Sequence, residues 1–271
     1  MISKKIDCFE YGQLLFENYS TVLSNENVED RIINTFNGNI EPDYFKENNI
    51  TPRVFINEFL LRYYPNETSI KSTFINNVLL KSTNHVTVFE LKVGNSRLDL
   101  CKINGISTAF EIKTELDTSV RLEHQMEDYF KTFEKVYLIC SESNIDKMID
   151  KIPKECGIYT YYSTKTGRYI FKKKRSAIKS SQISSYSQLS SLTKKDLQVY
   201  FKCKYDIDKD SMIEMIINSN TNKEINKIFK LCLKNKYLKK WEFLLENKSD
   251  ILEIDYQWFY KNLLSPEIVY Q

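Results

Sequence analysis

One run, RLDLCKINGISTAFEIK at residues 97–113, constrains the fold more than any other part of the chain. It contains Asn104-Gly105, a strong turn signal, between two runs with β-branched and aromatic residues. Gly105 tolerates a positive φ, so the tip is expected to be a three-residue loop that ends in a bulge at this glycine. The run therefore predicts a β-hairpin.

The expected register of this hairpin pairs Lys102 with Ile106 and Asp99 with Ala109. Side chains alternate along a strand, so the even-numbered residues share one apolar face, made of Leu98, Leu100, Thr108, Phe110 and Ile112. The odd-numbered residues share the other face: Arg97, Asp99, Cys101, Ala109, Glu111 and Lys113. Asp99 and Glu111 then become diagonal neighbours, roughly 7 Å apart at the backbone. A two-residue turn would place them on opposite faces, because a one-residue slip inverts a strand.

These residue types suit metal-dependent cleavage of a phosphodiester. Mg²⁺ prefers oxygen ligands and typically uses one or two carboxylates, here those of Asp99 and Glu111, with the backbone carbonyl of Ile112 as a further ligand. Lys113 would orient or deprotonate the attacking water, or neutralise the phosphate. Mn²⁺ is expected to substitute for Mg²⁺. The alternative is an ordinary solvated strand face with a Glu/Lys pair, since an isolated Asp…Glu-x-Lys pattern is a weak signal.

Two further strands are predicted around the hairpin. HVTVFELKV at residues 85–93 precedes it, and its alternation turns Glu90 to the face opposite Phe89 and Leu91. Glu90 is either an extra metal or water ligand or a strand-end residue that faces solvent. The apolar run VYLIC at residues 136–140 is typical of a buried strand.

A helix is predicted between the hairpin and residues 136–140. Asp117 or Thr118 can cap it, and helical spacing of apolar residues continues to about residue 133. Gln125 and Tyr129 are an i, i+4 pair, so they meet on one surface of this helix. Tyr129 has two interpretations, a core residue or a hydroxyl that positions substrate.

The order of these elements and their polar residues resembles the PD-(D/E)XK nuclease superfamily, and the Gln-x-x-x-Tyr helix is similar to that of RecB-type nuclease domains. The resemblance is greater to a stand-alone bacterial branch, carried by Glu111 to Lys113, Asp117, Thr118, Arg121, Leu122, Gln125, Tyr129, Pro153 and Gly157. It covers about residues 55–170. It implies an α/β fold, a mixed sheet of four to five strands flanked by helices, and Mg²⁺-dependent cleavage of nucleic acid. Leu98 stands where the superfamily has its proline, which does not touch the metal.

The resemblance also implies roles for residues outside the hairpin. Gln125 and Tyr129 would position the lysine, the water or the phosphate. Arg121 would contact a phosphate, or pair with Asp117 one turn away. Many members carry an acidic residue on their first helix; here Glu58 has that place, although a surface or ion-pair role is favoured for it.

A basic cluster follows the resembling region. It consists of Lys172, Lys173, Lys174 and Arg175. It would grip phosphates, or it is a solvated strand end that runs into a flexible Ser-rich linker.

Four consecutive regions are expected: a helical region at 1–54, the nuclease-like core at 55–175, the linker at 176–192 and a helical region at 193–271. The C-terminal helices are candidates to bind a second copy of the chain or a partner protein, or to pack on the core with their lysines outward. A net charge of +3 means that any field for nucleic acid must come from local patches.

Composition excludes several other classes of function. The six cysteines are scattered, so no iron–sulfur cluster or zinc site is expected. There are 6 glycines and no Gly-rich phosphate loop, which argues against ATP as a cofactor. No apolar run approaches the roughly 18 residues of a membrane span, and no secretory signal is visible, so a cytoplasmic location is expected.

The sequence therefore predicts a cytoplasmic, bacterial, Mg²⁺-dependent nuclease. DNA is the expected substrate and RNA is not excluded, and phage defence or mobile-element maintenance is the expected setting. The alternative is a catalytically silent module on the same fold that binds nucleic acid or protein.

Overall fold

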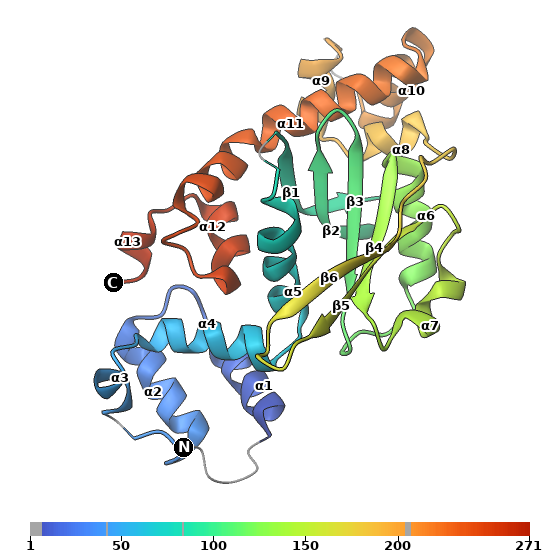
Figure 1. Cartoon of the computed structure of the whole chain (residues 1–271). Helices are drawn as coiled ribbons and strands as arrows, with labels where there is room; N and C mark the ends of the chain where they lie inside the picture. Colours follow the sequence, from blue (N-terminus) through green and yellow to red (C-terminus); the bar gives the residue numbers. More distant parts are fainter. Residues whose placement is uncertain (1–6, 42, 83, 204–206) are drawn as a thin grey trace. The chain divides into compact units, whose positions relative to one another are not determined.

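The computed structural model describes residues 7–41, 43–82, 84–203 and 207–271 (Figure 1). Contacts divide the chain into two compact units, each built from segments that are distant in sequence. Unit 1 combines Met1–Leu80, Ser163–Ile170 and Glu242–Gln271, whereas unit 2 combines Lys81–Tyr162 and Phe171–Trp241. The four consecutive regions expected from the sequence stay a prediction.

A mixed sheet forms the centre of the fold, and its strands lie in the order β1-β2-β3-β4-β5-β6. The β1–β2 and β2–β3 pairs are antiparallel, whereas β3–β4 and β4–β5 are parallel. The expected α/β class with helices beside a mixed sheet is confirmed, with six strands in the described residues in place of four to five. The strands are β1 Val86–Val93, β2 Ser96–Ile103, β3 Ser107–Lys113, β4 Lys135–Ser141, β5 Gly157–Ser163 and β6 Tyr169–Arg175.

The β2–β3 hairpin forms where it was expected, but its register is two residues away from the predicted one. Lys102 pairs with Thr108 in place of Ile106, and Cys101 pairs with Ala109 in place of Asp99. The loop is residues 104–106, with Gly105 at its centre at φ +76°. Ile106 therefore belongs to the loop and not to the strand. Because the loop still has an odd length, the side chains of Asp99 and Glu111 keep the same facing.

The expected division into an apolar face and a chemical face is wrong. Cys101 and Ala109, placed on the chemical face, are fully buried in the core of unit 2. Phe110 and Ile112, on the expected apolar face, are buried as well. Strands covered on both faces carry apolar residues on both, and polar side chains then occur only where partners satisfy them.

Helix α6 (Leu122–Thr132) packs on β1, β2 and β4, with its Leu122, Met126 and Tyr129 in the core (Figure 1). The predicted cap is wrong: the helix begins after Arg121, which makes no side-chain cap. The carboxylate of Asp117 instead accepts hydrogen bonds from the N–H and the hydroxyl of Thr114, both at 2.8 Å. Asp117 therefore binds Thr114, in the loop before α6, and does not cap this helix.

The other helices of unit 2 either connect β4 to β5 or come after β6 in the chain. Thr193 caps α9 with a reciprocal bond to Asp196, and Asp208 caps α10. These other helices are α7 Ile145–Met148, η2 Ile149–Lys151, α8 Ser185–Ser190, α9 Lys194–Tyr200, α10 Lys209–Ser219 and α11 Asn222–Asn247, the last of which continues into unit 1.

Residues 176–192, expected as a flexible linker, are partly helical and partly buried. The Ser180 hydroxyl donates to the Phe130 carbonyl at 2.6 Å. Gln188 and Leu189 of α8 are fully buried, and the Gln188 amide donates to the Thr132 carbonyl at 3.0 Å. The Ser180 hydroxyl and the Gln188 amide satisfy backbone carbonyls of α6, so a Ser-rich composition does not make this segment a free tether.

Unit 1 is helical and has its own core, in which Leu15, Val28, Ile32, Phe36 and Leu60 are buried. Asp7, Ser24, Thr51 and Asn66 cap its longer helices with side-chain hydrogen bonds. Its elements are α1 Cys8–Asn18, α2 Asn25–Phe36, α3 Tyr44–Glu47, α4 Pro52–Tyr63, α5 Glu67–Phe74, the π-helical η1 Ile75–Leu79, η3 Glu253–Asp255, α12 Tyr256–Asn262 and α13 Pro266–Val269.

A buried carboxylate joins the distant segments of unit 1. Asp255 is 1% exposed and accepts hydrogen bonds from the hydroxyls of Tyr19, Thr21 and Tyr270 at 2.7–2.8 Å. Arg53 donates to the Tyr19 hydroxyl at 3.3 Å and lies over the Tyr270 ring. The charge of Asp255 is thus surrounded by donors, as a buried carboxylate requires.

Candidate metal and active site

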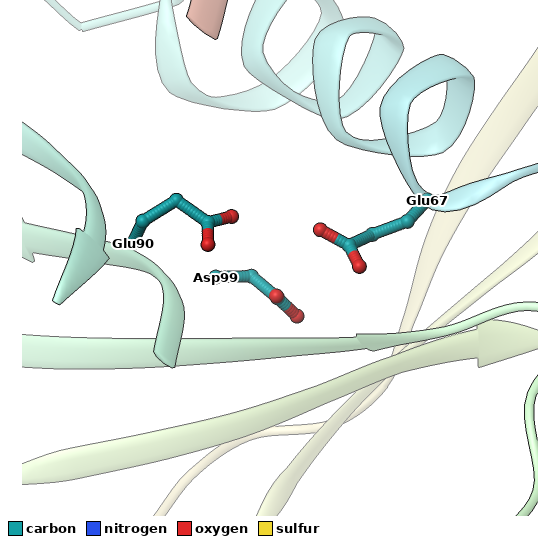
Figure 2. A group of neighbouring side chains, drawn as sticks. All are labelled: Glu67, Glu90 and Asp99. Atoms are coloured by element: carbon teal, nitrogen blue, oxygen red, sulfur yellow. The ribbon is translucent and has the colours of Figure 1, made fainter. Parts of the chain in front are cut away.

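Two carboxylates converge where β1 and β2 pair. The register joins Phe89 to Leu100 and Leu91 to Leu98, so Glu90 and Asp99 lie between these two pairs. Figure 2 shows the two side chains extending in the same direction, and an oxygen of each lies within 4.8 Å of the other. Glu67, also drawn there, belongs to unit 1.

Glu90 reaches this position through an unusual backbone. Its φ is +54°, a left-handed conformation that is costly for a non-glycine residue, by roughly 1 kcal/mol or more. Such local strain is typical of functional sites.

Each of the two carboxylates also has a partner within unit 2. The Arg97 Nε lies 2.7 Å from the Glu90 Oε2, with the Arg97 side chain 74% exposed and that of Glu90 only 9%. The Ile112 N–H donates to the Asp99 Oδ2 at 2.7 Å. The amide of Ile112 thus holds Asp99 in place, whereas its carbonyl as a metal ligand stays a prediction.

Glu111 is the centre of a buried hydrogen-bond cluster and is 1% exposed. Its Oε1 accepts from the Lys113 Nζ at 2.8 Å and from the Gln125 amide at 2.6 Å. Its Oε2 accepts from the Tyr129 hydroxyl at 2.9 Å. Gln125 and Tyr129 reach it because they lie one turn apart on α6. In this structure they orient Glu111, and Tyr129 is at once a core residue and a polar contact.

Electrostatics keep Lys113 protonated. Burial lowers its pKa, but the charge and hydrogen bond of Glu111, with the charges of Asp99 and Asp117, raise it above the ordinary value overall. Burial and the charges of Glu111 and Asp99 likewise raise the pKa of Tyr129, so its hydroxyl stays a donor. Lys113 can therefore supply a positive charge and hydrogen bonds at this site.

The site residues predicted from sequence fall into two groups. Asp99, Glu111, Lys113, Gln125 and Tyr129 come together in unit 2, with Glu90 beside Asp99.

The basic cluster lies elsewhere, on β6, with β4 and β5 between it and β3. Arg175 donates to the carbonyls of Pro153 and Cys156, and Lys174 pairs with Glu142. Lys172 lies over the Tyr162 ring. Three of the four cations therefore have protein partners in this structure.

Sequence reasoning placed Arg97 on the same face as Asp99 but gave it no role, and it missed the strain at Glu90. Arg97 precedes Asp99 by two residues on β2, which puts the two side chains on one face of a regular strand. That spacing was the available signal for Arg97. No residue type predicts a positive φ at a glutamate, so the sequence contained no signal for this strain.

The oxygens of Glu90 and Asp99 fit a hard divalent cation such as Mg²⁺ or Mn²⁺. They are carboxylate oxygens on neighbouring strands, and each is oriented by a donor from the same unit.

Within the described part of the chain, no helix has both the length and the apolar character that a membrane crossing requires.

Comparison with known proteins assigns the chain to a family. The family described as bacteriophage P4 protein cII matches residues 62–257, more than half of the sequence. The chain belongs to this family. A curated relative, protein cII of Enterobacteria phage P4, is 32% identical over 76 residues, which are 27% of this chain and 29% of that protein. The chain thus spans less than a third of the length of that relative. No solved structure matches.

Proposed function

We propose that this protein is a metal-dependent nuclease that hydrolyses phosphodiester bonds of DNA. The observation that carries the proposal is the gathering of Asp99, Glu111 and Lys113 in one buried place, with Glu90 beside Asp99. These residue types match the needs of phosphodiester hydrolysis: carboxylates for a cation, and a charged donor for the phosphate. The phage name of the family supports a setting in phage defence or mobile-element maintenance.

The proposed roles follow from the contacts. Asp99, Glu90 and Glu111 would hold a divalent cation, which when bound lowers the pKa of a water and stabilises charge on the phosphate. Lys113 would turn its ammonium from Glu111 toward the phosphate oxygens and orient the attacking water. Gln125 and Tyr129 would keep the Glu111 carboxylate in one orientation. Arg121 and the basic cluster on β6 remain candidates to contact the nucleic acid away from the cleaved bond.

The test is cleavage of labelled single-stranded, duplex and branched DNA, with RNA alongside, in Mg²⁺, Mn²⁺ or EDTA. Wild type should cut at least one substrate with Mg²⁺ or Mn²⁺ and none in EDTA. Asp99→Ala and Lys113→Ala should each lose this activity while keeping their fold by circular dichroism. Asp146→Asn and Lys147→Ala, exposed on α7, are matched controls that should cut normally. Full activity of the Asp99→Ala variant would refute the proposal.

A second candidate function rests on the hydrogen bonds of Glu111. Both of its oxygens are satisfied by Lys113, Gln125 and Tyr129, an arrangement that is complete without an ion. This favours a silent module that binds nucleic acid or protein on the same fold. Fluorescence anisotropy of labelled DNA in EDTA distinguishes the two: tight binding with no cleavage in any metal would support the silent module.

A further inference from the structure

A pocket of about 720 Å³ lies within unit 1. The C-terminal half of α4, the helical segments α5 and η1, the tip of the β5–β6 hairpin and η3 surround it. Its volume is in the range of small-molecule sites, which are few in any protein. The side chains that decide what it can hold are Glu58, Arg62, Asn77, Arg168 and Glu253.

The pocket carries two carboxylates and two guanidinium groups that do not pair with one another. Among the described residues, no ion pair joins Glu58 or Glu253 to Arg62 or Arg168. Burial raises the pKa of Glu253 and the negative charge of Glu58 raises it further, although hydrogen bonds from Asn76 and Asn57 lower it in part. Opposite charges that share a pocket without pairing leave both kinds of group available to a ligand.

The arginine side of the pocket is built by the hairpin tip. Gly167 has φ +78°, and a side-chain carbon there would collide with the Arg62 Cγ. The absence of a side chain thus lets the stem of Arg62 lie against the tip. The tip is held by hydrogen bonds: the Thr164 N–H donates to the Arg168 carbonyl at 2.8 Å, and the Arg168 N–H donates to the Thr164 hydroxyl at 3.1 Å.

The carboxylate side is also fixed. The Asn76 amide donates to the Glu253 Oε1 at 2.6 Å, and Asn76 in turn accepts from the Tyr256 hydroxyl at 3.0 Å. Asn76 belongs to η1, a π-helical turn, and such turns occur frequently at functional sites. The neighbouring Asn77 donates to the Tyr169 carbonyl at 3.3 Å, which joins η1 to the hairpin. The pocket is therefore formed before any ligand enters.

We propose that this pocket binds a mononucleotide whose base carries an exocyclic amino group. Arg62 and Arg168 would take the phosphate, because guanidinium groups match phosphate oxygens in charge and geometry. Glu58 and Glu253 would accept hydrogen bonds from the amino group of the base, as carboxylates accept from the N4 amino group of cytosine. Neither free phosphate nor a free nucleoside satisfies both sides. The proposal is independent of cleavage in unit 2.

The experiment is calorimetric titration of the full chain in EDTA, so that no cleavage takes place. The ligands are AMP, GMP, CMP, UMP, inorganic phosphate and adenosine. At least one amino-bearing nucleotide should bind about tenfold or more tightly than UMP, which has no amino group, and more tightly than phosphate or adenosine. Arg62→Ala and Arg168→Ala should each weaken that nucleotide about tenfold, since each removes a charge-assisted contact.

Variants on the carboxylate side separate recognition from folding. Glu58→Gln, at an exposed position, should reduce the preference over UMP while leaving phosphate binding unchanged. Lys165→Ala removes a cation of the same hairpin that does not line the pocket, and it should bind as wild type does. Asp99→Ala in unit 2 should also bind normally. The proposal is overturned if no nucleotide binds saturably, or if the Arg62→Ala/Arg168→Ala double variant, folded by circular dichroism, binds as tightly as wild type.

Discussion

The guanidinium of Arg97 lies 2.7 Å from the buried carboxylate of Glu90, at the place where Glu90 and Asp99 converge. Arg97 itself is largely exposed, so it can leave this contact more easily than Glu90 can. Arg97 therefore neutralises a carboxylate that a cation would also use.

Replacing Arg97 should move two affinities in opposite directions. Arg97→Ala removes the competing positive charge, so Mn²⁺ binding measured by calorimetry should become several-fold tighter. It also removes a cation that would be free to contact phosphate, so DNA binding with bound metal should weaken. Lys92→Ala, which removes an exposed charge on β1 at the position paired with Arg97, is the control for charge alone. Unchanged Mn²⁺ affinity in Arg97→Ala would show that the pair does not compete with metal.

Comparing Glu90→Gly with Glu90→Ala should separate the backbone strain at this position from the chemical role of its carboxylate. Both variants lose the carboxylate, so both should lose cleavage. Glycine adopts a φ of +54° without penalty, whereas alanine does not, so Glu90→Gly should be about 1 kcal/mol more stable than Glu90→Ala in urea unfolding. Equal stability would mean that β1 relaxes to a regular strand when the glutamate is removed.

Removing the Tyr129 hydroxyl should affect both folding and activity. Tyr129→Phe removes the hydroxyl that donates to the buried Glu111 Oε2, which should cost about 1–3 kcal/mol of unfolding free energy. Cleavage should fall more than the loss of folded protein explains, because Glu111 loses its orientation. Tyr137→Phe, where the ring stacks on Phe110, is a matched control in the same unit and should keep activity.

Glu134 should make unit 2 sensitive to acid. Burial raises its pKa, but hydrogen bonds from Lys230, the Ser107 N–H and Asn226 lower it overall, below its ordinary 4.5. A depressed carboxyl pKa contributes stability that is present above about pH 4.5 and is lost as the pH falls through the lower folded-state value. Glu134→Gln should therefore be destabilised, by about 2–4 kcal/mol at pH 7.

This difference between wild type and Glu134→Gln should shrink on acidification. Urea unfolding at pH 7, 5 and 3 measures it. Glu142→Gln, which breaks only the exposed contact with Lys174, should change stability little at any pH. A constant difference at all three pH values would show that the charge of Glu134 is not what stabilises unit 2.

The sequence predicted the parts of the site that depend on local patterns. An odd-length loop around Gly105 places Asp99 and Glu111 with the same facing, and the four-residue spacing of Gln125 and Tyr129 brings both to Glu111. The exact register was missed by two residues, because Ile106 looks like a strand residue but forms part of the loop.

Other features depend on long-range packing, which local patterns do not record. The positive φ of Glu90 is maintained by the surrounding sheet, against the preference of a glutamate. The pocket of unit 1 combines Glu58, Arg168 and Glu253, which are far apart in the chain. Ser-rich residues 176–192 have the composition of a linker, and only the partners of Ser180 and Gln188 reveal that they are packed.

The hydrogen bonds of Asp255 set an order of events during synthesis. Its partners Tyr19 and Thr21 leave the ribosome more than two hundred residues earlier, whereas Tyr270 follows it. Every residue of unit 2 is made in between. The N-terminal helices can pack around Leu15, Ile32 and Phe36 once they are made, but Asp255 and Tyr270 can join them only when the last segment emerges. Unit 2 can close first, and the helices at the two ends of the sequence complete their fold around Asp255 only afterwards.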